Sequence, residues 1–137
     1  MIPSKYSTRW APTHRELSKK IREALSLVKN GRWSPGQPVK LKADFDELEK
    51  EFDIEMALLE DQEKILLAVL NEIKPEHYAG THPPTKAYET TVKGRDLFAF
   101  AWKSPFFDGQ EMYFKFCMNG TDDRKRVFIL SIHPSRN

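Results

Sequence analysis

The chain has 137 residues, with 22 lysines and arginines, 20 aspartates and glutamates, and one cysteine. This length is typical of one domain, and we expect residues 1–137 to form a single domain. The content of 39% hydrophobic and 12% aromatic residues excludes a disordered chain, and no apolar run approaches the roughly 18 residues of a membrane helix. The lone Cys117 excludes an internal disulfide and a cage of cysteines around a metal. Because the first residues contain no apolar signal segment, we expect a cytoplasmic protein without membrane contact.

The net charge of +2 conceals three blocks of opposite sign. Residues 1–40 carry a net charge of +7, residues 41–76 carry −8, and residues 77–137 carry +3. An acidic centre between basic flanks is compatible with ordinary solvated helix faces. It is also compatible with a basic surface, formed by the two flanks, that faces a polyanion.

The first half of the chain is predicted to be helical after an irregular arm over residues 1–12. Thr13 with Glu16 has the spacing of a capping box, and a helix with one apolar stripe follows over about residues 14–29. Asn30-Gly31 ends this helix, and the Pro- and Gly-rich residues 34–38 predict a loop.

Residues 41–75 complete the mainly helical part, which we place at residues 13–75. Asp44 is a candidate cap for a short helix, and a break is expected near Asp53. A second helix is predicted over about residues 60–73, with Pro75 as its stop.

The apolar period changes to two in the second half, which predicts an antiparallel sheet within residues 88–134. Three strands are expected at residues 96–103, 111–118 and 126–133, and residues 88–93 are a candidate fourth strand. The connections are short, which is typical of an antiparallel meander. We therefore predict an α+β fold in which N-terminal helices pack on a sheet of three or four antiparallel strands.

The alternation of side chains separates a core face from an open face of this sheet. Met112, Phe114, Phe116 and Met118 share the apolar face, so Tyr113 and Lys115 fall on the other one. If Phe128 and Leu130 join the core, Ser131 and His133 lie on the open face as well. They then neighbour Tyr113 and Lys115, provided that the hairpin register keeps the same parity.

A Tyr, a Lys and a His on one sheet face can act on a phosphodiester without a metal. The imidazole of His133 can transfer a proton near neutral pH, and Lys115 can stabilise negative charge at phosphorus. Tyr113 can stack on a base or donate a hydrogen bond, and Arg136 can bind a phosphate. Each residue also has an ordinary interpretation as an exposed sheet or surface side chain. His77 and His82 with Glu76 are too few to predict a metal site, and we predict neither a metal nor a cofactor.

Four segments together resemble a known family: His77-Tyr78-Ala79-Gly80, the run from Asp96 to Trp102, the run from Gly109 to Phe116, and Val127 to His133. They are similar to the motility quorum-sensing regulator (MqsR) toxin family of RelE-like ribonucleases, over about residues 14–134. This resemblance implies a RelE-like fold, cleavage of mRNA, free or on the ribosome, and a cognate antitoxin protein that covers the active face.

The family pattern is matched at some positions and not at others. Tyr113 and Lys115 match the strand that follows Gly109-Gln110, and Ser131-Ile132-His133 places a His where the family has a basic residue. Tyr78-Ala79-Gly80 lacks the Lys of the family motif, and Phe98-Ala99-Phe100 lacks its Gln. Replacements for the missing positive charge are sought among Lys86, Lys93 and Arg95.

The predicted function is that of a metal-independent mRNA endoribonuclease, the toxin of a toxin–antitoxin pair. Tyr113, Lys115 and His133 are its predicted catalytic residues, and the predicted phosphate contacts are Arg126, Arg136, Lys93 and Arg95. One alternative is a non-catalytic module of the same fold that binds nucleic acid or protein. Another is a small-molecule pocket between helices and sheet, lined by Phe, Met and Trp.

Overall fold

The computed structural model describes residues 12–81, 84–88 and 92–135. Three helices precede the main strands, so the predicted α+β class is confirmed. The helices and strands are α1 (His14–Lys29), β1 (Trp33–Pro35), α2 (Pro38–Phe52), α3 (Leu59–Glu72), β2 (Phe98–Ser104), β3 (Gln110–Asn119) and β4 (Arg126–Pro134). The short 3-10 turns are η2 (Pro75–His77), η4 (Pro105–Phe107) and η5 (Asp122–Arg124).

The four strands form a mixed sheet in the order β1-β4-β3-β2. β2, β3 and β4 form the predicted antiparallel meander, whereas β1 pairs with β4 in parallel. The expectation of a purely antiparallel sheet was therefore wrong. Among the described residues the fourth strand is Trp33–Pro35, inside a segment whose prolines predicted a loop, while the candidate strand at residues 88–93 lies partly outside the described residues. A strand of three residues at a sheet edge tolerates a proline, because its outer N–H has no strand partner to lose.

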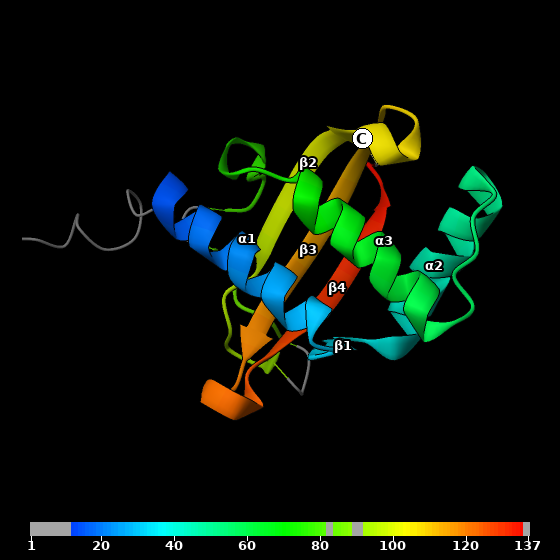
Figure 1. Ribbon diagram of the computed structural model, residues 1–137. Coiled ribbons are helices and arrows are strands. Elements are labelled where there is room, and N and C mark those ends of the chain that lie inside the picture. Colours follow the sequence, from blue (N-terminus) through cyan, green and yellow to red (C-terminus); the bar gives the residue numbers. More distant parts are fainter. Residues whose placement is uncertain (1–11, 82–83, 89–91, 136–137) are drawn as a thin grey trace, which may run out of the picture.

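The helices occupy two different places around this sheet. α1 and α3 lie across one face and contact each other, while α2 lies at the side of the sheet that β1 and β4 form and contacts β4 (Figure 1). The covered face of the sheet carries the large apolar side chains predicted for the core. Apolar side chains of the helices pack against them and complete the core. The buried residues of this core include Leu17, Leu48, Leu66, Val69, Phe100, Met112, Phe114, Phe116, Val127, Ile129 and Ile132.

Local sequence signals set the helix ends. The capping box at α1 is confirmed, since the Thr13 Oγ1 accepts from the N–H of Glu16 at 3.1 Å and the Glu16 carboxylate accepts from the N–H of Thr13 at 2.8 Å. α3 ends before Pro75, as predicted. α2 ends at Phe52, and the following Asp53 has a positive φ of 54° and marks the predicted break.

The prediction that Asp44 caps a helix was wrong. α2 begins at Pro38, because proline suits the first turn of a helix, and Asp44 therefore lies inside it. Its carboxylate is buried against β4 instead of being exposed at a helix end.

A β-bulge divides β4 into two parts with opposite alternation. Lys115 of β3 pairs with Ser131, but Phe116 pairs with Ile129, so Leu130 is the extra residue. Val127, Ile129 and Ile132 consequently all face the helices. Phe128 and Leu130, which we expected in this core, instead pack on the opposite face. The bulge restores Ser131 and His133 to the face of Tyr113 and Lys115.

That opposite face is partly covered. A second, smaller apolar cluster forms there from the segment before β2 and the adjoining strands, and it contains Ala87, Val92, Leu97, Cys117 and Leu130. It leaves the other end of the face, where β3 begins and β4 ends, for polar side chains. Within the described ranges, no helix has the length and apolar character to cross a membrane.

Candidate functional site

Tyr113 and His133 form an aromatic pair on the polar end of the open sheet face. They are direct cross-strand partners in β3 and β4. Their ring centroids are 5.4 Å apart and the ring planes differ by 25°, so the rings are stacked. Both side chains are half-buried, which leaves part of each ring accessible to a ligand.

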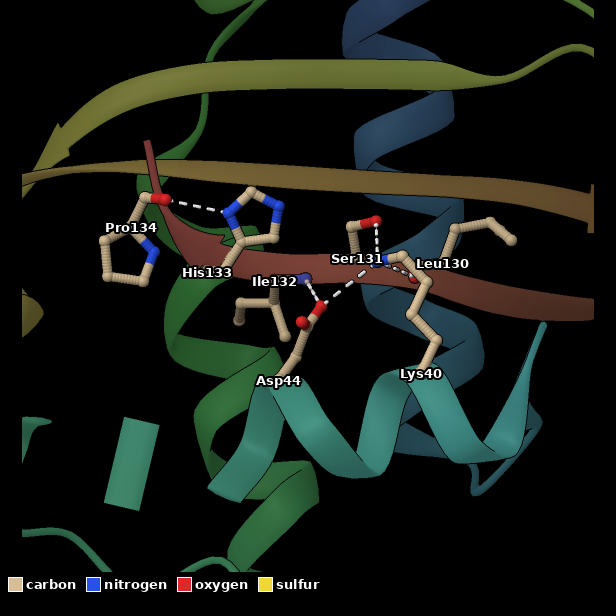
Figure 2. Close-up of polar contacts among 7 residues, drawn as sticks. All are labelled: Lys40, Asp44, Leu130, Ser131, Ile132, His133 and Pro134. Carbon is tan, nitrogen blue, oxygen red and sulfur yellow. Dashed lines mark hydrogen bonds and ion pairs between the residues drawn. The ribbon is translucent and has the colours of Figure 1, made fainter. Parts of the chain in front are cut away.

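A backbone contact selects the tautomer of the His133 ring. Its Nδ1 lies 2.7 Å from the carbonyl oxygen of Pro134. A carbonyl oxygen only accepts hydrogen bonds, so the proton of this contact belongs to Nδ1. In the neutral ring Nε2 is then the nitrogen with the lone pair, and it points away from that carbonyl (Figure 2). This arrangement gives the site a proton acceptor of defined position.

Burial controls the protonation of the neighbouring phenols. Burial raises the pKa of Tyr113 above its ordinary value of 10.0. The pKa of Tyr78 is also raised, first by burial, then by the nearby carboxylate of Asp96 and by Tyr113. Tyr113 is consequently a neutral phenol at physiological pH, and it acts as a hydrogen-bond donor or stacking surface, not as a base.

The next pair along the strands carries the positive charge. Lys115 pairs with Ser131, and paired residues have their side chains on the same face. Lys40 reaches the same place from α2, since its Nζ donates to the Ser131 Oγ at 2.7 Å and lies 3.4 Å from the Leu130 carbonyl oxygen (Figure 2). Lys40 was not among the predicted site residues. Its position depends on contacts across 91 residues of sequence.

Asp44 holds this part of the site in place. β1 pairs with β4 only as far as Ile129, and beyond that residue no strand in the described ranges pairs with the outer edge of β4. Asp44 Oδ2 accepts from the backbone N–H of Ile132 at 3.0 Å and lies 3.5 Å from the Lys40 Nζ. α2 thus takes the place of a strand at this edge, and its side chains form hydrogen bonds with backbone groups that no neighbouring strand pairs with in the described ranges.

The other predicted phosphate contacts are not gathered here. Arg126 lies at the opposite end of β4, about 23 Å from His133 along an extended strand. Its guanidinium donates to the Trp33 carbonyl at 2.8 Å and to the Ser34 hydroxyl at 3.2 Å, so it fixes β1 to β4. Lys93 and Arg95 are exposed in the segment before β2, and Arg136 lies outside the described residues.

Lys86, named from the sequence as one source of positive charge near Tyr78-Ala79-Gly80, is also described by the structure. Lys86 forms an ion pair with Asp96 beside an isolated backbone bridge between the same two residues. The Tyr78 hydroxyl donates to the Thr81 carbonyl at 2.6 Å. Lys40, in contrast, donates a hydrogen bond to the Ser131 hydroxyl and so lies beside Lys115, the strand partner of Ser131.

A second concave region lies away from these residues. It is a cleft of about 480 Å³ between α2 and the start of α3, lined by Trp33, Phe45, Met56 and nine other residues. The lining has the Trp, Phe and Met side chains of the small-molecule alternative, but it also includes charged residues, Lys42, Asp46 and Glu49. In the described part of the chain, no three His, Cys, Asp or Glu side chains gather as metal ligands would.

Comparisons with protein-family models, with curated proteins and with solved structures find no match for this chain. The geometry of the open sheet face is therefore what indicates a function for this protein.

Proposed function

We propose that the chain is a metal-independent endoribonuclease that cleaves mRNA, and that it is the toxin of a toxin–antitoxin pair. The observation that supports this most is the stacked Tyr113–His133 pair next to Lys115, at the end of the sheet face that the apolar cluster leaves uncovered. This group combines an aromatic surface, a nitrogen base and a cation, which are the groups that act on a single-stranded RNA phosphodiester.

The proposed reaction is an attack of a ribose 2′-hydroxyl on the adjacent phosphorus. His133 Nε2 takes the hydroxyl proton while the bond from the 2′-oxygen to phosphorus forms. The bond from phosphorus to the 5′-oxygen breaks, that oxygen takes a proton from water as it leaves, and the protonated His133 returns its proton to the solvent. The products are a 2′,3′-cyclic phosphate and a free 5′-hydroxyl, so no redox partner or metal is required.

The remaining residues stabilise charge and position. Lys115 balances the negative charge that builds on the nonbridging oxygens. Tyr113 is neutral and can donate its hydroxyl proton in a hydrogen bond to one of them, while its ring holds the imidazole. A protein antitoxin would inhibit this activity by covering the same face, and the resemblance to the MqsR family suggests such a partner.

Cleavage of a mixed mRNA in EDTA tests the proposal. The wild-type chain should cut the RNA and leave 2′,3′-cyclic phosphate ends, and His133→Ala should lose the activity by about a hundredfold or more. His14→Ala is the matched control, because His14 is exposed at the start of α1, which packs on the other face of the sheet. A well-folded wild-type protein that leaves the RNA intact would refute the nuclease, and a fully active His133→Ala would refute the site.

The second candidate is a module that binds single-stranded nucleic acid without cutting it. It is favoured by the composition of β2, where Ala99 pairs with Lys115 and Ala101 pairs with Tyr113. β2 therefore adds no polar group at the place where the resemblance leads us to look for a Gln. RNA binding by the wild type without any cleavage would select this alternative.

A further inference from the structure

Two lysines from different elements flank the Ser131 side chain. Lys115 is the direct cross-strand partner of Ser131 on the β3 side. Lys40 lies on the opposite side, at the edge of the sheet, and its ammonium is 2.7 Å from the Ser131 hydroxyl oxygen. Side chains of directly paired residues begin about 5 Å apart, which is within the reach of a lysine. The two ammonium groups can therefore approach one anion from both sides of Ser131.

The contacts of Lys40 leave it able to bind such an anion. Its side chain is 44% exposed, so the ammonium is accessible to solvent. One of its contacts is short, the 2.7 Å hydrogen bond to Ser131. The contacts with the Leu130 carbonyl and the Asp44 carboxylate are longer, at 3.4 and 3.5 Å. A phosphate oxygen can replace one of the longer contacts while the short one keeps the ammonium in position.

The local charge favours an anion as well. Two ammonium groups and one buried carboxylate give the cluster an excess positive charge. The Asp44 carboxylate accepts a hydrogen bond from the N–H of Ile132 and therefore holds Lys40 next to the strand. The Lys40 ammonium stays accessible from the solvent side. Figure 2 shows the Lys40, Asp44 and Ser131 part of this cluster, with His133 farther along β4.

We infer that Lys40 and Lys115 together bind one phosphate of an RNA substrate over Ser131, with His133 at the adjoining ribose. This inference rests on the proposed function, since it names the group that holds the substrate at that site. Lys40 brings a positive charge from α2 to the Ser131 side chain. The segment Tyr78-Ala79-Gly80 has no positive charge to contribute. It is a substrate-binding residue, and Asp44 is the residue that positions it.

Binding of an uncleavable RNA tests the inference apart from catalysis. The probe is a short, fluorescein-labelled single strand in which every 2′-hydroxyl is 2′-O-methyl, so that the proposed attack cannot occur. Affinity is measured by anisotropy across a range of salt concentrations. Lys40→Met should weaken binding about tenfold, the effect expected of one charge-assisted contact, and should reduce the slope of log affinity against log salt by about 0.7.

The neighbouring Lys42 provides a matched control. Lys42 forms an ion pair with Asp46 that has the same i, i+4 spacing as the pair of Lys40 with Asp44. Unlike Lys40, Lys42 lies on the exposed side of the helix. Lys42→Met should bind the probe within about twofold of the wild type, since its charge is not at the site. Lys40→Arg keeps the charge and should retain most of the affinity, which separates loss of the cation from damage to the fold.

The outcomes separate this inference from the nuclease proposal. Loss of affinity in Lys40→Met and not in Lys42→Met supports the two-lysine site, even where the wild type cuts no RNA. Equal affinity of Lys40→Met and wild type overturns the site, even where the wild type is an active nuclease. Equal losses in the two methionine variants, or no binding of the probe by the wild type, overturn it as well.

Discussion

The carboxylate of Asp44 in α2 accepts a hydrogen bond from the backbone N–H of Ile132 in β4, at 3.0 Å and across 88 residues of sequence. Ile132 is fully buried, so this N–H has no access to water. The contact therefore joins a helix to a strand edge where β1 has already ended. It also fixes the backbone between Ser131 and His133, the two residues on which the proposed site depends.

Asp44→Ala should destabilise the fold by about 2–3 kcal/mol. The substitution leaves a buried N–H unsatisfied and removes the partner of Lys40. Urea denaturation followed by circular dichroism measures the loss. Asp46→Ala is the control, since its ion pair with Lys42 has the same spacing but is exposed, and about 0–0.5 kcal/mol is expected. Similar losses in the two variants would contradict the structural role of Asp44.

Gly120 is required by the turn between β3 and β4. Its φ is +89°, and a Cβ at this position would clash with the carbonyl oxygen of Arg124. Gly120→Ala should therefore cost about 2–3 kcal/mol of folding stability, from backbone strain and from the clash. Gly109 in the preceding turn has a φ of +78° with open space around it, so Gly109→Ala should cost only about 1 kcal/mol. A larger loss at Gly109 than at Gly120 in thermal denaturation would refute this reasoning.

Stability should fall in alkaline solution because of the buried phenols. The pKa values of Tyr113 and Tyr78 are raised in the folded chain, mainly by burial. Above a pH of about 10 the unfolded chain releases these protons first, so the free energy of unfolding decreases as the pH rises towards the folded values. Below pH 10 this contribution is fully present.

Tyr113→Phe should make this alkaline decline shallower, as measured by urea midpoints between about pH 9 and pH 11. The same substitution at Tyr88, whose side chain is 75% exposed, is the control for loss of a phenol. A decline that is as steep in Tyr113→Phe as in the wild type would contradict the assignment of the raised pKa to this residue.

Features set by neighbours in sequence could be predicted. The capping box at Thr13, the stop before Pro75 and the three meander strands depend on residues a few positions apart, and each is found. Strand alternation also placed Tyr113 on the face opposite to Phe114 and Phe116, because β3 is polar on one side and apolar on the other.

Features set by distant contacts could not be predicted. The run from Val127 to Leu130 is apolar at every position, so either face could have been the core and the bulge at Leu130 left no signal. Ser131 and His133 reach the open face as predicted, but through that bulge and not through burial of Phe128 and Leu130. The parallel strand β1 and the contact of Lys40 with Ser131 each depend on partners more than 90 residues away.

Two substitutions at Tyr113 should separate the roles of its ring and its hydroxyl. Tyr113→Phe keeps the ring stacked on His133 and removes only the donor, so cleavage should fall about a hundredfold while binding of the 2′-O-methyl RNA changes less than about twofold. Tyr113→Ala also removes the stacking surface, so binding should weaken by roughly 1–3 kcal/mol.

Anisotropy and single-turnover cleavage on the same protein preparations measure the two effects. Lys42 at an exposed position of α2 offers a control outside the site, and Lys42→Met should leave both quantities close to those of the wild type. If Tyr113→Phe cleaves at the wild-type rate, the hydroxyl has no part in the reaction and the ring acts through stacking alone. If both Tyr113 variants bind and cleave normally, the stacked pair with His133 is a feature of the sheet and not of a nuclease site, because its loss would then leave the chemistry untouched.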